Sequence, residues 1–131
     1  MTGGSANADN FAGGGFLGLS SIAVSGAVGS TINLNHVAIN ATSSSAVNSA
    51  IGVNVGGIIN LLNSTIQTTG VDGGPATGIN IAATGVVNAQ GNTINTATTG
   101  VTSSVIIAAG GVFNNNGSNV CIENGIVVAC P

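Results

Sequence analysis

Lysine and arginine are absent from this chain, and its charged residues are the three acids Asp9, Asp72 and Glu123. Nucleic-acid binding requires cationic side chains that neutralise phosphates, and anionic membrane surfaces attract proteins through the same side chains. The composition therefore argues against both kinds of partner. It also leaves trypsin-like proteases without a cleavage site, which favours an extracellular or cell-surface location.

Tryptophan and tyrosine are also absent, and no apolar stretch reaches the roughly 18 residues of a membrane-spanning helix. Gly, Asn, Ser and Thr interrupt every apolar segment. The chain is nevertheless 44% hydrophobic, which separates it from disordered sequences. We therefore expect a single folded domain without membrane insertion.

Four asparagines recur at a nearly constant spacing. Asn33, Asn60, Asn88 and Asn114 are separated by 27, 28 and 26 residues (60 − 33, 88 − 60, 114 − 88). A period in this range is typical of solenoids, in which each repeat forms one coil of chain. A solenoid of this size is more often a scaffold or a binding surface than an enzyme.

Aliphatic residues keep the same register as the asparagines, and each set predicts a column of side chains stacked inside the solenoid. The residues that directly precede the asparagines are Ile32, Ile59, Val87 and Phe113. Those that follow six positions later are Ile39, Ile66, Ile94 and Val120. Two further expected columns are Val24, Ile51, Ile79 and Val105, and Val28, Val55, Ala83 and Ala109.

Within each repeat, short apolar alternations such as residues 51–55 are typical of strands. Clusters of Ser, Asn, Gly and Thr between them indicate corners. Three short strands and three corners fit one repeat, which predicts an all-β parallel β-helix of about four coils of 26–28 residues. Because neighbouring coils pair about 4.8 Å apart, the asparagines in register are expected to form a ladder of side-chain amides.

The chain divides into two parts by composition. Residues 1–15 contain mainly Gly, Ala, Ser and Asn, and we expect them to form a flexible arm. Phe16, Leu17 and Leu19 begin the apolar structure, so residues 16–131 are predicted to form a single β-solenoid domain. Its expected coils span about 22–49, 50–77, 78–104 and 105–131.

Residues that could support catalysis or metal binding are few. Glycoside hydrolysis needs a pair of carboxyl groups, but the repeat places Asp72 and Glu123 about two coils apart. His36 is the only histidine and is expected at an exposed corner, so no zinc or calcium site is predicted. We therefore expect no catalytic residues, no cofactor and no metal, and do not expect an enzyme.

Cys121 and Cys130 are the only cysteines. They flank an Asn-Gly pair between apolar segments, which predicts a β-hairpin. A two-residue turn places Cys121 opposite Val128, so a bridge is expected to need a shifted register or a wider loop. In an exported protein we favour an intrachain disulfide, with free thiols and an interchain bridge as alternatives.

Threonines at positions 65, 68, 93 and 96 form pairs around Ile66 and Ile94. Rows of threonine on a flat solenoid face can order water, and such rows resemble those of β-solenoid ice-binding proteins. Only two coils carry these pairs. Ice binding is therefore an alternative function.

The pattern Gly-h-h-Asn-x-x-(Asn/Gly)-x-(Thr/Asn)-h, where h is apolar, occurs at 57–66, 85–94 and 111–120. It resembles coils of bacterial filamentous-haemagglutinin-like and autotransporter passenger domains, and also the laddered subunits of curli-type fibres. The resemblance covers about residues 22–120 and implies a right-handed β-helix. Those families are mostly much longer and more charged, and none of their functional residues can be assigned here.

A short solenoid exposes a sheet edge at each end, and such edges readily pair with another chain. Repeat proteins usually protect these edges with polar or charged caps, but this chain has few charges to use. The sequence therefore predicts a structural subunit that binds copies of itself head to tail and forms an extracellular filament or matrix fibre. The alternative is a monomeric β-solenoid binding module, either an ice binder or a fragment of an adhesin stalk.

Overall fold

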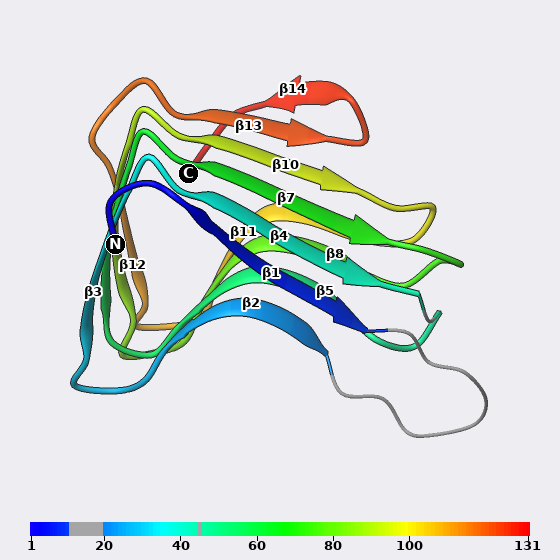
Figure 1. Cartoon of the computed structure of the whole chain (residues 1–131), viewed down its shortest axis with the longest axis horizontal. Helices are drawn as coiled ribbons and strands as arrows, with labels where there is room; N and C mark the ends of the chain where they lie inside the picture. Colours follow the sequence, from blue (N-terminus) through cyan, green and yellow to red (C-terminus); the bar gives the residue numbers. More distant parts are fainter. Residues whose placement is uncertain (11–19, 45) are drawn as a thin grey trace.

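A computed structural model describes residues 1–10, 20–44 and 46–131 of the chain. Over these residues the protein consists of strands and turns, with no helix. The strands stack as a β-solenoid of four coils, in which each coil contributes one strand to each of three sheets (Figure 1). The predicted fold class and the number of coils are confirmed.

The three sheets, here named A, B and C, run along the solenoid axis. Sheet A contains β3 (Thr31–Asn35), β6 (Ile58–Leu62), β9 (Val86–Gln90) and β12 (Val112–Asn115). Sheet B contains β1 (Ser5–Asn10), β4 (Ala38–Ser43), β7 (Thr65–Gly70), β10 (Thr93–Ala97), β13 (Val120–Glu123) and β14 (Ile126–Val128). Sheet C contains β2 (Ser21–Gly26), β5 (Ala50–Val55), β8 (Ala76–Ile81) and β11 (Thr102–Ile107).

Neighbouring coils pair in parallel, and the pairing register confirms the repeat. Asn33 lies opposite Asn60, and Asn60 lies opposite Asn88. Among the strands that the structure describes, only the last pair in sheet B, β13 with β14, is antiparallel. Coils 1 to 4 thus comprise β2–β4, β5–β7, β8–β10 and β11–β13.

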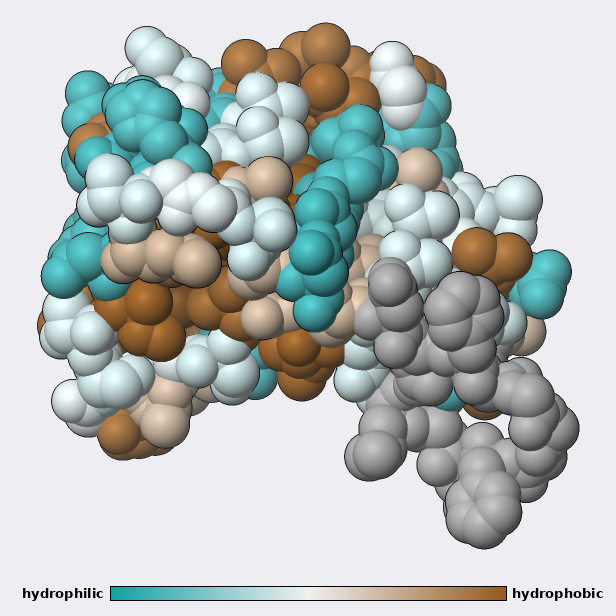
Figure 2. Space-filling model, in the orientation of Figure 1, coloured by the Kyte–Doolittle hydropathy of each residue, from teal (hydrophilic) through white to brown (hydrophobic). Residues whose placement is uncertain are grey.

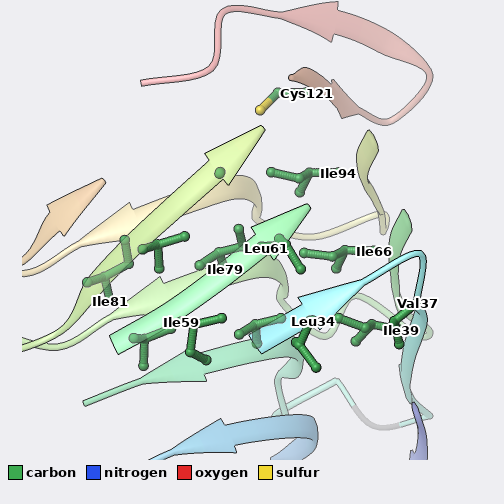
Figure 3. Packing of buried hydrophobic residues seen from close by; sticks show 14 residues of the cluster. Leu34, Val37, Ile39, Ile59, Leu61, Ile66, Ile79, Ile81, Ile94 and Cys121 are labelled. Atoms are coloured by element: carbon green, nitrogen blue, oxygen red, sulfur yellow. The ribbon is translucent and has the colours of Figure 1, made fainter. Parts of the chain in front are cut away.

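Aliphatic side chains from all three sheets meet in the core (Figure 3). The predicted column Ile32, Ile59, Val87 and Phe113 is in register across sheet A. Its two central members are fully buried, whereas Ile32 and Phe113 at the ends are partly covered. This is the pattern expected of a stack, because only inner coils have neighbours on both sides.

The predicted column through sheet B is right for Ile39, Ile66 and Ile94 but wrong for Val120. Ile94 pairs with Cys121, and Val120 lies opposite Thr93 with 40% of its surface exposed. The corner before β13 is one residue longer: Cys121 follows Asn114 by seven positions (121 − 114), whereas Ile94 follows Asn88 by six (94 − 88). The extra residue inverts the alternation, so Cys121 occupies the core position (Figure 3).

Sheet C corrects the two other expected columns. Val53, rather than Ile51, aligns with Val24 and Ile79, because the corner between β5 and β6 contains only residues 56–57, whereas the corners between β2 and β3 and between β8 and β9 contain 27–30 and 82–85. A Cβ atom on Gly52 would lie 2.4 Å from the Ile66 side chain, so this position accommodates only glycine. Val55 aligns with residues 26, 81 and 107, whereas the expected partners at 28, 83 and 109 are exposed.

Part of the segment expected to form a flexible arm, residues 1–15, is a strand. Ser5–Asn10 forms β1, which pairs with β4 residue for residue. Ala6 and Ala8 take the positions of Ile39 and Ala41 in the next coil, so small side chains continue the inner columns. The expected onset of apolar structure at Phe16, Leu17 and Leu19 lies outside the described residues.

Candidate functional site: the outer faces and the two ends of the solenoid

The predicted asparagine ladder lies on the outer face of sheet A. Asn60 donates from Nδ2 to Asn33 Oδ1, Asn88 donates to Asn60, and Asn114 donates to Asn88, each at 2.7 Å. All three bonds point toward the preceding coil. The ladder is confirmed, and the half-buried amides at its centre satisfy one another without any charged group.

Two more amide rows were not predicted. On sheet C, Asn80 donates to Asn54 at 2.8 Å. On sheet B, Asn40 donates to Asn7 at 2.8 Å, and Asn95 donates to Gln67 at 2.9 Å. Figure 2 shows a hydrophilic stripe that runs along the solenoid axis. The same spacing of 26 to 28 residues could have revealed the rows at 54–80 and 67–95.

A further ladder closes the corner between sheets A and B, and it also escaped prediction. The amide of Val37 donates to Ser64 Oγ at 3.1 Å, and the amide of Ser64 donates to Asn92 Oδ1 at 2.8 Å. Asn119 Oδ1 accepts from the amide of Asn92 at 3.0 Å. Ser64 and Asn92 are buried, so these side chains replace the hydrogen bonds that the turning backbone loses.

His36 stands at this corner and is exposed, as the sequence predicts. It has a φ of 54°, and the equivalent Asn63 and Gly91 have φ values of 47° and 68°. A left-handed conformation turns the chain here, and Asn and Gly tolerate it best. The described residues contain no group of three or more His, Cys, Asp or Glu that could hold a metal ion.

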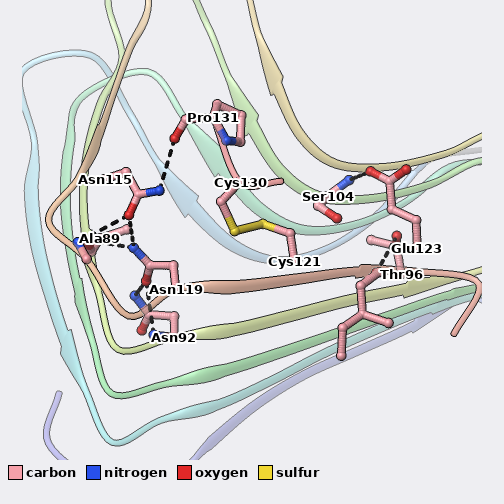
Figure 4. Close-up of a disulfide and its surroundings, with 12 residues drawn as sticks. Ala89, Asn92, Thr96, Ser104, Asn115, Asn119, Cys121, Glu123, Cys130 and Pro131 are labelled. Atoms are coloured by element: carbon pink, nitrogen blue, oxygen red, sulfur yellow. Dashed lines mark hydrogen bonds between the residues drawn. A yellow bond between two sulfur atoms is a disulfide. The ribbon is translucent and has the colours of Figure 1, made fainter. Parts of the chain in front are cut away.

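The two acids with described side chains lie in different surroundings. Asp72 is exposed in the loop between β7 and β8, beside a shallow hollow lined by Thr69, Val71 and Thr98 among others. Glu123 lies at the end of β13, and its Oε1 accepts a hydrogen bond from the amide of Ser104 at 2.7 Å (Figure 4). The structure does not join them into a carboxylate pair.

The expected rows of threonine pairs are wrong. Thr68 and Thr96 are fully buried and point inward, while Thr65 is exposed on the outer face. Threonines at i and i+3 cannot share a face of a strand, because side chains alternate. Short uncharged side chains do form straight outer columns on sheet B, at 38, 65 and 93 and at 42, 69 and 97.

The C-terminal end is latched by a disulfide between Cys121 and Cys130, whose Cα atoms are 5.4 Å apart. The predicted intrachain bridge is confirmed, but it needs no shifted register. Cys121 still faces Val128, and the chain after β14 turns back across the end of the solenoid (Figure 4). The carbonyl of Pro131 accepts a hydrogen bond from Asn115 Nδ2 at 3.2 Å, which holds the C-terminal residue against sheet A.

Beyond this latch, the C-terminal end is open. In β11, Ile107 is 40% exposed, whereas its partner Ile81 in the preceding coil is fully buried. In β14, Ile126 and Val127 are 68% and 69% exposed. Figure 2 shows hydrophobic atoms gathered at the end of the molecule where β14 lies.

The N-terminal end is covered on two of its three sheets. Thr2 forms a parallel bridge with Asn35 of sheet A, and the terminal amino group donates to the Asn33 carbonyl at 2.6 Å. Strand β1 covers β4 of sheet B. Among the described residues, sheet C ends at β2, where Ile22 is 37% exposed.

Comparison with family models, with curated proteins and with solved structures finds no match to this chain. Within residues 1–10, 20–44 and 46–131, the structure holds no helix long and apolar enough to cross a membrane.

Proposed function

We propose that this protein is a structural subunit whose copies join end to end into an extracellular or cell-surface filament. The observation that carries the proposal is the order of sheet B, β1-β4-β7-β10-β13-β14. Among the described residues, this sheet runs the full length of the molecule, and its terminal strands β1 and β14 each have one edge without a partner strand. Unpaired strand edges are templates for another chain.

A contact between opposite ends of identical molecules does not close on itself. If one copy's C-terminal end meets the N-terminal end of the next, every added copy presents the same free end again, and growth continues as a filament. Joining sheet B in this way gives an axial repeat of about 29 Å, since six strands are spaced about 4.8 Å apart. We assign no catalytic activity to the chain.

The charges do little to prevent such a contact. Natural sheet edges are commonly blocked by lysine or by other exposed charges, and this chain has no lysine. Glu123, the acid nearest the C-terminal end, is engaged with the Ser104 amide of β11 and therefore does not guard the edge of β14. The exposed apolar residues of β14 favour association.

The disulfide is consistent with the proposed extracellular location and with assembly through the end of sheet B. Disulfides persist in oxidising compartments, which agrees with an exported protein. A strand as short as Ile126–Val128 has little pairing of its own, and the covalent link through Cys130 holds it on the sheet. The link thus presents the end of sheet B as a fixed edge.

Sedimentation and negative-stain electron microscopy of the purified, oxidised chain test the proposal. We expect unbranched fibres above a threshold concentration and a meridional fibre-diffraction spacing of about 4.8 Å. The fibres should persist in high salt, because there is little charge to screen. A chain that stays monomeric at millimolar concentration would contradict assembly, and the function would then be that of a monomeric binding module.

If the protein is a monomer, the outer face of sheet B is the candidate binding surface. Its straight columns of Ala, Thr, Asn and Gln are a flat uncharged surface, suited to ordered water or to a neutral polymer. Ice binding is tested by comparing how well the wild type and variants with Thr65 or Thr93 replaced inhibit the recrystallisation of ice. Unchanged inhibition in these variants would exclude this face as the ice-binding surface.

A further inference from the structure

We infer that the free edge of β14 in one copy pairs with the free edge of β1 in the next copy, in antiparallel orientation. The inference rests on the proposed function and names the two strands that make its contact. Two copies related by a shift along the solenoid axis keep the direction of their sheet B strands. Since β14 runs opposite to β13, the next copy's β1 runs opposite to β14.

The backbone of β14 has one residue free for this pairing. Asn124 and Gly125, with φ values of 50° and 79°, form a two-residue turn, and Glu123 lies opposite Ile126. The two residues that flank such a turn form backbone hydrogen bonds with each other. Along the ladder, hydrogen-bonded pairs then alternate with pairs that are not hydrogen-bonded. Ile126 and Val128 therefore face β13, whereas the N–H and C=O of Val127 face outward.

The outer edge of β1 presents matching groups. The amide of Ala38 donates to the Gly4 carbonyl at 3.0 Å, so Gly4, Ala6 and Ala8 turn their backbone groups toward β4. The alternate residues Ser5 and Asn7 direct theirs away from the sheet. Antiparallel pairing of Val127 with either residue satisfies donors and acceptors on both strands.

The side chains also fit. Val128 lies opposite Cys121 on the inner face and packs against the core, and Ile126 on the same face is 68% exposed. The inner residues of β1 are Ala6 and Ala8. Docking brings these small side chains beside the two bulky ones, which buries Ile126 and continues the core from one copy to the next.

The pairing of β14 with β1 also uses every free edge of sheet B in a single kind of contact. A pair of β14 strands or a pair of β1 strands is symmetric and stops at two copies, leaving one edge open on each molecule. Continuous growth through symmetric pairs requires both kinds. The structure therefore favours the heterologous pair, and the symmetric pairs are outcomes that the experiment can detect.

Two proline variants test the assignment. Val127→Pro removes the outward N–H of β14, and Asn7→Pro removes that of β1, where proline is tolerated because neither N–H faces a neighbouring strand among the described residues. Val127→Ala and Asn7→Ala are the matched controls, because they shorten the side chain and keep the N–H. Circular dichroism and intact mass verify the fold and the disulfide of each variant.

We expect each proline variant to remain monomeric at concentrations where both alanine controls assemble, with a threshold concentration raised roughly tenfold or more. An equimolar mixture of the two proline variants should stop at dimers, because one intact β14 meets one intact β1. A dimer of Val127→Pro alone, or of Asn7→Pro alone, would reveal a symmetric contact and overturn the inference.

The design separates this inference from the proposed function. A wild-type chain that never assembles defeats the proposed function, and the inference with it. A wild type and a Val127→Pro variant that form equal fibres support assembly but exclude the β14 edge. Hydrogen exchange of the wild type adds a test that needs no variant, because fibres should protect the Val127 amide and the monomer should not. An unprotected Val127 amide in fibres would overturn the pairing.

Discussion

Coils 3 and 4 carry the same repeat, but only coil 3 has a neighbour on both sides. Ile81 is fully buried, whereas Ile107, its partner in coil 4, is 40% exposed. Val87 is likewise buried and Phe113 only partly covered. In a solenoid, equivalent residues of one column thus contribute differently to stability, because the burial of each depends on the next coil.

The largest expected effect comes from placing a charge inside a central coil. Ile94→Asp or Ile66→Asp would bury an unpaired carboxylate in the core and should abolish folding. Val120→Asp places the same charge one position before the core column and should fold, since Val120 is exposed. Far-UV circular dichroism and thermal unfolding show which of these variants fold. A folded Ile94→Asp variant would contradict the assignment of the core.

Truncation of matched residues measures the difference between the two coils directly. Ile81→Ala should lower the free energy of unfolding by about 2–4 kcal/mol, because it leaves a cavity in a closed core. Ile107→Ala should cost about 1 kcal/mol or less in the monomer, since the side chain is partly in water. Denaturant unfolding at a concentration below assembly gives both values, and equal losses would show that coil 4 is covered in solution.

Removal of the disulfide tests how firmly the end of coil 4 is held. Cys130→Ser frees a segment closed by a short loop and should destabilise the oxidised protein by about 2–3 kcal/mol. The wild type under reducing conditions serves as the control and should show a similar loss. Intact mass showing two free thiols in the protein as freshly isolated, before any reductant is added, would contradict the latch.

The smallest effect is expected from the outer ladder. Asn88→Ala breaks two side-chain bonds in a half-buried row and should cost about 1–2 kcal/mol, because Asn60 and Asn114 each lose a partner. Asn114→Ala, at the exposed end of the row, breaks only one and should cost less. Unfolding midpoints that are unchanged for both variants would show that the ladder adds no stability.

Much of the repeat could be predicted from local pattern. The spacing of Asn33, Asn60, Asn88 and Asn114 determined the coil length, the ladder and the sheet A column, because parallel pairing in register places equal residues above one another. The position of Cys130 near Cys121 also follows from proximity in the chain. These features depend on one period and on few distant contacts.

Tertiary structure alone decided which residues turn inward where the period is disturbed. The longer corner before β13 exchanges Val120 for Cys121, and the shorter corner between β5 and β6 moves the core position from Ile51 to Val53. A shift of one residue turns every side chain of a strand to the opposite face, and no local feature of the sequence reveals such a shift. The pairing of Ser5–Asn10 with β4 likewise depends on a ready-made edge rather than on the strand propensity of that segment. The chain's own sequence therefore determined the repeat, and contacts between coils decided how the repeat begins and ends.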